Sequence, residues 1–471
     1  MITQRRGLSK VVGAIFIIVI ILLILVLGLI SYSNDNFRDL NDIENIGERN
    51  GDNYLNEDSS LETPVIVWEL NGTIYDVYKN NGKIYILAVE DTPNMVRRDV
   101  YMYVFDLDSY ELLDKILVYQ EIIGATPKFK FLTIKDDYVY LYNTIENKSY
   151  NITIFSVSDG EIRGSYLLEG VSPIAIVSNY IYLYRIESEN VLVLEEYNLD
   201  SGNLTLEIRK ELPGIDRLDE VFNVFISLRG DTLYSIVVGY EADFEFSRFR
   251  IYHIILKYSV VSKSLDIEVF PSKTYGAYGS LLTATGYIVN DSYFIFHAFS
   301  LSKDGDTFYG YLVERRTLDG GSLLWSYEED IVLGMRNRSA YISSYVDSNG
   351  IFYVSWVFIG GFKDGDKIFS RSPWGGIYVT STPFIVVTAT VSEGGINFLE
   401  LDGDIYIPWV KRVKGSGIKE LILYQVDNES LREVYDLYDM GYRGLAFFVY
   451  ESNLYLVGSY KGMTSVIVKL I

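Results

Sequence analysis

The chain has 471 residues, of which 49% are hydrophobic, with a formal net charge of −22 and no cysteine. This composition can bury a large core and is unlike that of a disordered chain. The missing cysteines exclude disulfides, thiol catalysis and zinc or iron–sulfur groups held by thiolates. The acidic balance argues against a nucleic-acid partner, whose phosphates a basic surface has to neutralise.

The 41 tyrosines are unusual, and glutamine occurs only at Gln4, Gln120 and Gln425. A depletion of thermolabile residues is typical of a hyperthermophile's protein. A biased genome would give the same counts, so both interpretations stay open.

Residues 11–30 form an uncharged apolar run, VVGAIFIIVIILLILVLGLI. As a helix it would be about 30 Å long, the hydrocarbon thickness of a bilayer. Arg5, Arg6 and Lys10 precede it, which predicts a cytoplasmic N-terminus and an external C-terminal part. The run is longer than the apolar core of a removable secretory signal, which favours an uncleaved anchor.

The segment Arg5-Arg6-Gly7, followed by LSKVVG, resembles the class III signal of archaeal type IV pilins. The resemblance implies that a prepilin peptidase cuts between Gly7 and Leu8 and that the apolar helix is retained. In a filament that helix would pack against copies of itself or against other pilin-like subunits. Val12 stands where bacterial pilins have a glutamate, which archaeal members commonly lack. A plain signal anchor is the alternative.

We therefore expect a leader at 1–7, an anchor or pilin-like helix at 8–46, an acidic linker at 47–63 and a large domain at 64–471. Residues 34–62 contain nine acidic residues and only two arginines, which indicates a spacer whose like charges repel one another. The helix residues expected to face membrane or filament are Val11, Val12, Ile15, Phe16, Val19, Leu22, Leu23, Val26 and Ile30.

From residue 64 onward a repeat recurs, in which a tight turn precedes a tyrosine-rich strand. Its eight copies begin at Gly82, Asp137, Asn179, Asp231, Asp291, Gly350, Asp404 and Asn453. The mean period from Tyr85 to Tyr455 is about 53 residues, which suits four-stranded propeller blades with generous loops. Residues 360–395 fit the period worst, so the sixth blade is expected to be decorated.

Third and fourth strands follow several copies, joined by turns such as Leu199-Asp-Ser-Gly202 and Leu318-Asp-Gly-Gly321. This pattern resembles the blades of quinoprotein-like β-propellers and implies the fold without naming an activity. The predicted fold class is an N-terminal hydrophobic α-helix followed by an all-β domain, an eight-bladed β-propeller. Seven blades and a tandem of β-sandwiches are the alternatives.

The last copy ends after its third strand, and residues 65–70 form a spare strand before the first copy. We expect this spare strand to complete the last blade. That closure would protect the sheet edges and tie both ends of the domain together.

No catalytic, metal or cofactor residue is assigned from the sequence. His253 and His297 lie in apolar strand-like runs and are interpreted as core or groove residues. No Gly-x-Ser-x-Gly elbow is present. Some peptidases join an anchor, an eight-bladed propeller and a hydrolase domain, but this chain ends with the propeller, so we expect no enzyme.

Three Asp-Gly-Asp triplets, at 304–306, 364–366 and 402–404, are interpreted as turns rather than calcium ligands. Trp356, Trp374 and Trp409 could line a sugar-binding face, although packing between blades explains them as well. Acceptor motifs for N-glycosylation occur at Asn71, Asn147, Asn151, Asn203, Asn290, Asn337 and Asn428.

Together these features predict an archaeal cell-surface structural or adhesive protein, a pilin-like subunit of a type IV pilus-like filament that displays a glycosylated propeller. The expected partners are the membrane, prepilin peptidase, other subunits and surface glycans. A signal-anchored propeller that binds ligands or organises the envelope without polymerising is the alternative. A propeller enzyme, such as a quinone-dependent dehydrogenase or a glycosidase, is a third possibility.

Overall fold

The computed structural model places Leu61–Ile471 in one compact unit. It describes residues 63–91, 97–122, 129–145, 149–169, 175–188, 190–243, 245–303, 306–331, 342–356, 358–371, 387–388, 398–412, 419–427, 430–461 and 464–471. None of these residues belongs to a helix long and apolar enough to span a membrane. The predicted leader, helix and linker of residues 1–62 lie outside the described residues.

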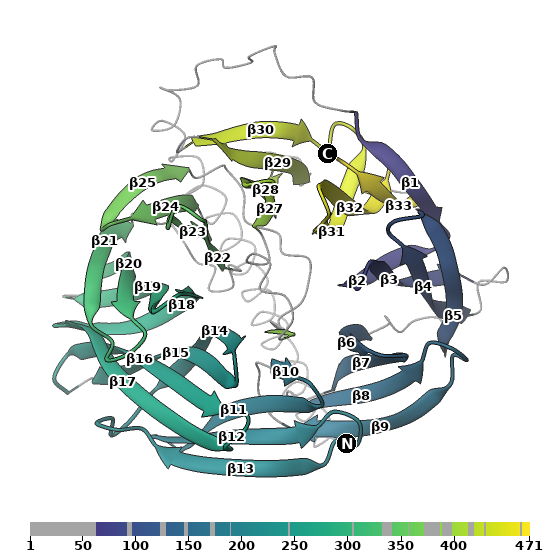
Figure 1. Ribbon diagram of the computed structural model, residues 1–471. Coiled ribbons are helices and arrows are strands. Elements are labelled where there is room, and N and C mark those ends of the chain that lie inside the picture. Colours follow the sequence, from purple (N-terminus) through teal and green to yellow (C-terminus); the bar gives the residue numbers. More distant parts are fainter. Residues whose placement is uncertain are drawn as a thin grey trace, which may run out of the picture. The chain divides into compact units, whose positions relative to one another are not determined.

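Eight antiparallel sheets are arranged around a common centre, one blade after another in chain order (Figure 1). Blade I contains β2 (Thr73–Asn80), β3 (Lys83–Asp91), β4 (Arg97–Asp106) and β5 (Glu111–Ile122). Blade II contains β6 (Lys130–Lys135), β7 (Tyr138–Ile145), β8 (Ser149–Ser156) and β9 (Ile162–Glu169). Blade III contains β10 (Ala175–Val177), β11 (Tyr180–Ser188), β12 (Val191–Asn198) and β13 (Leu204–Glu211).

Blade IV contains β14 (Glu220–Arg229), β15 (Thr232–Asp243), β16 (Arg248–Ser259) and β17 (Ser264–Tyr275). Blade V contains β18 (Tyr278–Val289), β19 (Ser292–Lys303), β20 (Asp306–Thr317) and β21 (Leu323–Ile331). Blade VI contains β22 (Ser343–Val346), β23 (Phe352–Ser355), β24 (Ile359–Lys363) and β25 (Asp366–Arg371). Blade VII contains β27 (Leu399–Leu401), β28 (Asp404–Arg412), β29 (Lys419–Asp427) and β30 (Ser430–Asp436).

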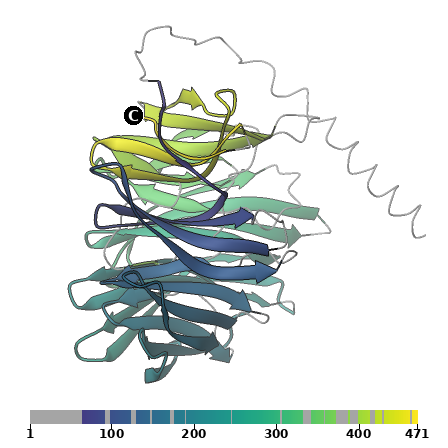
Figure 2. The ribbon, with the colours of Figure 1, turned by 90° about the vertical axis from the view of Figure 1, so that its right-hand side faces the viewer.

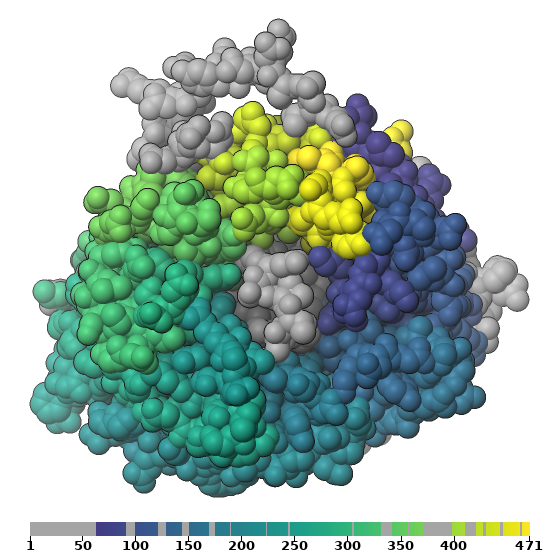
Figure 3. Space-filling model, in the orientation of Figure 1, coloured from purple at the N-terminus to yellow at the C-terminus, as the bar shows by residue number. Residues whose placement is uncertain are grey.

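Blade VIII is built from both ends of the domain, in the spatial order β1 (Val65–Leu70), β33 (Thr464–Lys469), β32 (Asn453–Tyr460) and β31 (Tyr442–Tyr450). The pairing runs from Val65 opposite Lys469 to Leu70 opposite Ser465, with a register shift at Val67. In Figure 3 the purple N-terminal strand lies against the yellow C-terminal strands. The prediction that residues 65–70 complete the eighth blade is confirmed.

The eight predicted copies of the repeat all fall at the beginning of the second strand of a blade. Immediately after the third strand of each of blades I to V, a backbone N–H donates a hydrogen bond to a backbone carbonyl in the turn that precedes the second strand. The donors are Leu107, Val157, Leu199, Val260 and Leu318, and the acceptors are Gly82, Asp137, Asn179, Asp231 and Asp291. This recurring bond gives the repeat its constant geometry.

The first strands of blades I, II, IV, V and VIII carry a register shift, as between Ile74 and Asp76 or between Leu281 and Thr283. A β-bulge increases the local twist of a strand. A strong twist lets each blade turn its face toward the next. Figure 2 shows the twisted blades from the edge of the ring.

The core is divided among the interfaces between blades, and each pair of neighbouring blades encloses one apolar cluster among the described residues. Blades IV and V, for example, pack Val238 and Ile255 against Ile295 and Leu312. Since strand side chains alternate between the two faces, each inner strand supplies two interfaces at once. This explains the near-continuous burial of segments such as Ser292–Phe299.

The chain between β25 and β27 is longer than other connections between blades. Of its residues 372–397 the structure describes only β26 (Val387–Thr388), which pairs in parallel with the innermost strand of blade III, β10. Of residues 360–395, which were expected to decorate the sixth blade, 360–371 belong to β24, β25 and their turn in an ordinary four-stranded blade, and the rest belongs to this long connection.

Candidate functional site

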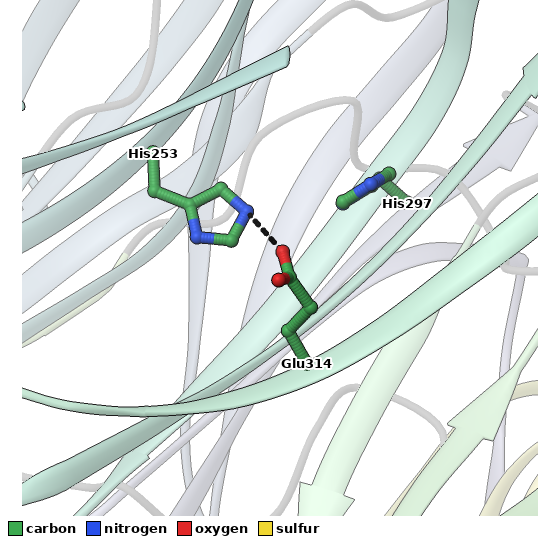
Figure 4. Close-up of side chains that lie close together, drawn as sticks. All are labelled: His253, His297 and Glu314. Carbon is green, nitrogen blue, oxygen red and sulfur yellow. Dashed lines mark ion pairs between the residues drawn. The ribbon is translucent and has the colours of Figure 1, made fainter. Parts of the chain in front are cut away.

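The strongest grouping of chemically capable side chains lies between blades IV and V and consists of His253, His297 and Glu314 (Figure 4). His253 belongs to β16, His297 to β19 and Glu314 to β20. In the register of blade V, His297 pairs with Leu312 and Glu314 pairs with Ile295. His297 and Glu314 are therefore diagonal neighbours on the face that packs against blade IV.

The three side chains are deeply buried, with relative exposures of 0% for His253, 0% for His297 and 2% for Glu314. Their potential ligand atoms all lie within 4.8 Å of one another. The shortest approach is 3.2 Å, between His253 Nε2 and Glu314 Oε2. The two imidazole rings are nearly perpendicular, at 72°, with their centroids 5.8 Å apart.

Other polar groups hold the Glu314 carboxylate in place. Arg316 Nη2 donates to Glu314 Oε1 at 2.7 Å, and Ser272 Oγ donates to Oε2. The Tyr293 hydroxyl lies 3.4 Å from His253 Nδ1. Arg316 also donates to the carbonyl of Gly321 at 2.9 Å, which fixes the guanidinium against the turn before β21.

Neither ring nitrogen of His297 has a hydrogen-bond partner among the described residues. Nε2 of His253 makes no well-aligned hydrogen bond and has only the Glu314 carboxylate beside it, at 3.2 Å. A buried polar atom without a partner costs about 1–3 kcal/mol, and such atoms are rare in folded proteins. The cluster therefore has binding capacity that the surrounding protein does not use.

Burial also determines the charge of the two imidazoles. It lowers the pKa of His297 to about 3, assisted by the neighbouring His253 and Arg316 and opposed by Glu314. Burial, with Arg316, lowers the pKa of His253 well below its ordinary value. Both rings are neutral at pH 7, the form in which an imidazole lone pair can bind a proton donor or a metal ion.

The sequence indicated core or groove positions for both histidines, and the structure buries both of them in the core. The sequence analysis did not bring the two histidines together, and it did not single out Glu314. The alternation of side chains and the repeat would have given the face of each residue on its own strand. They do not reveal which face packs on which neighbouring blade, and that information is what assembles the cluster.

Two of the three tryptophans named as possible binding residues are buried. Trp356 packs on Phe296 with ring centroids 5.7 Å apart, and Trp409 is fully buried between blades VI and VII. The interpretation that they pack between blades is confirmed. Trp374 lies outside the described residues.

Two Asp-Gly-Asp triplets form turns, as expected. Asp364 and Gly365 join β24 to β25 with φ angles of 52° and 89°, and Asp402 and Gly403 join β27 to β28 with 51° and 90°. These values are typical of two-residue hairpin turns. Of the third triplet the structure describes only Asp306, the first residue of β20.

Four of the seven glycosylation motifs lie among the described residues. Asn71, Asn203 and Asn290 are exposed in turns between strands. Asn151 is different, because it lies half-buried within β8 and accepts a hydrogen bond from Ser165 Oγ at 2.9 Å. Asn147, Asn337 and Asn428 lie outside the described residues.

No protein-family model and no curated protein sequence matches the chain. Solved β-propellers resemble it in structure. The β-propeller domain of the Trilobed protease from Pyrococcus furiosus aligns over 85% of this chain and 94% of that one, with 9% identity and a TM-score of 0.37.

A prolyl endopeptidase aligns over 84% of this chain and 55% of its own, with 9% identity and a TM-score of 0.40. The extracellular domains 1–2 of Drosophila semaphorin 1b align over 88% of both chains, with 10% identity and a TM-score of 0.33. At these identities the likeness concerns the fold alone. The class of protein defined so far is an eight-bladed β-propeller.

Proposed function

We propose that the chain is a cell-surface subunit of archaeal type, in which a pilin-like helix carries an external propeller head. The leader 1–7 would be removed by prepilin peptidase between Gly7 and Leu8. Helix 8–46 would then anchor the protein in the membrane or pack in a type IV pilus-like filament, and the acidic segment 47–63 would hold the head away from it. No catalytic activity forms part of this proposal.

The observation that carries the proposal is the combination of Arg5-Arg6-Gly7 with the apolar run 11–30 in one chain with a closed ring. The ring begins at Val65, directly after the spacer, and its last strand pairs with its first. A head built in this way needs no disulfide to hold its ends together. Such closure suits an exposed domain without cysteine.

The acceptor asparagines refine the proposal. Asn71, Asn203 and Asn290 are exposed in turns between strands, where an acceptor side chain is accessible. Asn151 lies within a strand with its side chain engaged by Ser165. We therefore expect glycans on the first three and none on Asn151.

The test is the mass of the mature N-terminus, measured on protein from membranes and from sheared surface material. A start at Leu8, found also in the sheared fraction, supports filament membership. A matched variant, Gly7→Phe, should keep the leader if a prepilin peptidase makes the cut. A start at Met1 or Ile2 confined to membranes would overturn the filament proposal and favour a signal-anchored, ligand-binding propeller.

A further inference from the structure

We propose that His253, His297 and Glu314 form a three-ligand site for a divalent first-row transition metal, with Zn²⁺ the ion that the donor set fits best. Two imidazole nitrogens and one carboxylate oxygen are ligands that Zn²⁺ takes in proteins, often with water in a fourth position. Cysteine, the other common zinc ligand, is absent from this chain. The site would connect blade IV to blade V through the interior of the propeller.

The distances suit such a site. In a tetrahedral zinc centre with bonds of about 2.0–2.1 Å, neighbouring donor atoms stand about 3.3 Å apart. His253 Nε2 and Glu314 Oε2 are 3.2 Å apart, so one edge of the tetrahedron is already formed. A nitrogen of His297 has to come closer than its present position, within the 4.8 Å that encloses the group.

The neighbouring groups orient the ligands as outer-shell partners do in metal sites. With the proton on His253 Nδ1, shared with the Tyr293 hydroxyl at 3.4 Å, the lone pair of Nε2 faces Glu314. Arg316 donates a hydrogen bond to the other carboxylate oxygen, Oε1, so that Oε2 points toward His253. Ser272 Oγ also reaches Oε2 and restricts its rotation.

The unpartnered nitrogens are the independent observation that points to a ligand. His297 is fully buried, and neither of its ring nitrogens has a partner among the described residues. Coordination would occupy one nitrogen of each imidazole. A single buried water is the competing explanation, and the experiment below distinguishes the two.

Arg316 is the group that opposes a cation, because its guanidinium charge lies beside the carboxylate. Arg316 therefore has two opposed effects on a bound metal ion. Its charge repels the cation, and its hydrogen bond to Oε1 orients the carboxylate ligand.

The experiment uses the full-length protein, produced in zinc-supplemented medium and purified without chelator. Metal content is measured by elemental mass spectrometry. The protein is also unfolded with chelator and refolded with or without Zn²⁺, or with Co²⁺, whose visible absorption reports four-coordinate geometry. We expect one metal ion per chain, a higher melting temperature after refolding with Zn²⁺, and a cobalt spectrum.

Two variants make the test specific. His297→Ala should lose the bound metal, the cobalt spectrum and the response of the melting temperature to Zn²⁺. Thr285→Val is the matched control, because Thr285 is buried in blade V and bonds to Ser344, a residue of blade VI. This control should keep all three signals, even if it is less stable.

The proposal is overturned if wild-type protein carries no stoichiometric metal, gives no cobalt spectrum and refolds to the same melting temperature with and without Zn²⁺. The cluster would then hold a water or remain a buried polar defect. Both outcomes are independent of the mature N-terminus, so this inference and the proposed surface function can fail separately.

Discussion

Tyrosine hydroxyls and carboxylates form a recurring pair in this propeller. Tyr258 donates to Glu196 at 3.0 Å, Tyr252 to Glu241 at 3.1 Å and Tyr275 to Glu328 at 2.9 Å. Burial and the adjacent carboxylates raise the pKa of Tyr258 and Tyr275, so both phenols keep their proton and act as donors. The large numbers of tyrosines and acidic residues thus have a common structural use.

Glu196 is the most connected of these carboxylates. It is 2% exposed on β12 and accepts hydrogen bonds from Thr205 at 2.8 Å and from Tyr258 and Lys263 of blade IV at 3.0 and 2.5 Å. Burial raises its pKa, but the bonds from Lys263, Thr205, Tyr182 and Tyr258 together lower it below the ordinary value. The ionised form therefore stabilises the contact between blades III and IV.

Glu196→Gln should lower the free energy of unfolding by about 1–3 kcal/mol, because charge-assisted bonds are replaced by neutral ones. A lowered pKa gives stability that is present above pH 4.5 and is lost as the pH falls through the folded value. The difference between wild type and variant should therefore shrink below pH 4.5. Urea unfolding across pH measures both effects. Glu207→Gln, at an exposed pair with Arg209, is the control, and an equal loss there would contradict the argument.

The pKa of Asp76 is shifted in the opposite direction from that of Glu196. It lies at the bulge of β2 and accepts the Phe131 N–H of blade II at 2.7 Å. Burial raises its pKa from 3.8 to about 6, although the Phe131 N–H and the Lys130 charge lower it. The folded state therefore holds this proton more tightly than the unfolded state, and stability falls as the pH rises from about 4 to 6.

Asp76→Asn should remove this part of the pH dependence, since the amide oxygen can still accept from Phe131. We expect the variant to gain about 1–3 kcal/mol over wild type at pH 7, with no gain near pH 4. Chemical unfolding of both proteins at several pH values provides the measurement. A variant that is less stable at pH 7 would show that the ionised carboxylate helps the fold.

At the scale of elements, β1 closes the ring by pairing with β33. Its Trp68 packs on Phe105 of blade I with ring centroids 4.5 Å apart and donates from Nε1 to the carbonyl of Tyr110 at 2.9 Å. Around it, Ser465 donates to the carbonyl of Gly72 at 2.5 Å, and Lys79 to that of Val449 at 2.7 Å. Gly72 has a φ of 89°, and a Cβ there would lie 2.3 Å from the Val89 oxygen.

Trp68→Ala should destabilise the closure of the ring before the other blades. A half-buried tryptophan that loses its packing and its hydrogen bond costs about 2–3 kcal/mol. Amide hydrogen exchange should therefore accelerate in β1 and β33 more than in blades III to V. Glu69→Ala, an exposed neighbour on the same strand, should leave exchange unchanged. Uniform acceleration in all blades would indicate that closure and the rest of the ring open together.

The repeated elements were predictable because their signals are local. A turn residue followed by alternating apolar and tyrosine residues defines each second strand, and the spare strand at 65–70 could be assigned by counting strands. Two features were not predictable. The pairing of Val387 with Ala175 joins segments from different blades and has no local pattern. Glu314 resembles Glu195, its counterpart on β12, and only the packing of blade V on blade IV adds His253 to its neighbour His297.

At the scale of the whole molecule, the pairing of its two ends closes the ring, and among the described residues the pairing of β26 with β10 also joins segments far apart in the chain. Each blade contacts mainly its neighbours, so an opened ring exposes the edges of two blades while the other interfaces remain. In the closed ring, β1 and β33 connect positions that are about 400 residues apart in the chain. The stability of the ring therefore depends on a contact of very high sequence separation, which is slow to form and sensitive to the loss of one strand.

The absence of cysteine allows a direct test of this closure. Val65 and Lys469 face each other across β1 and β33, and Ser259 and Ser264 face each other at the ends of one hairpin of blade IV. Facing positions on neighbouring strands lie close enough for a disulfide. Loop entropy gives about 6 kcal/mol for a disulfide at 65 and 469 and about 2 kcal/mol for one at 259 and 264. The oxidised double variant Val65→Cys with Lys469→Cys should therefore gain more in melting temperature over its reduced form than Ser259→Cys with Ser264→Cys. If the first pair does not oxidise, or gains no more than the hairpin pair, the ends of the domain do not close the ring in solution.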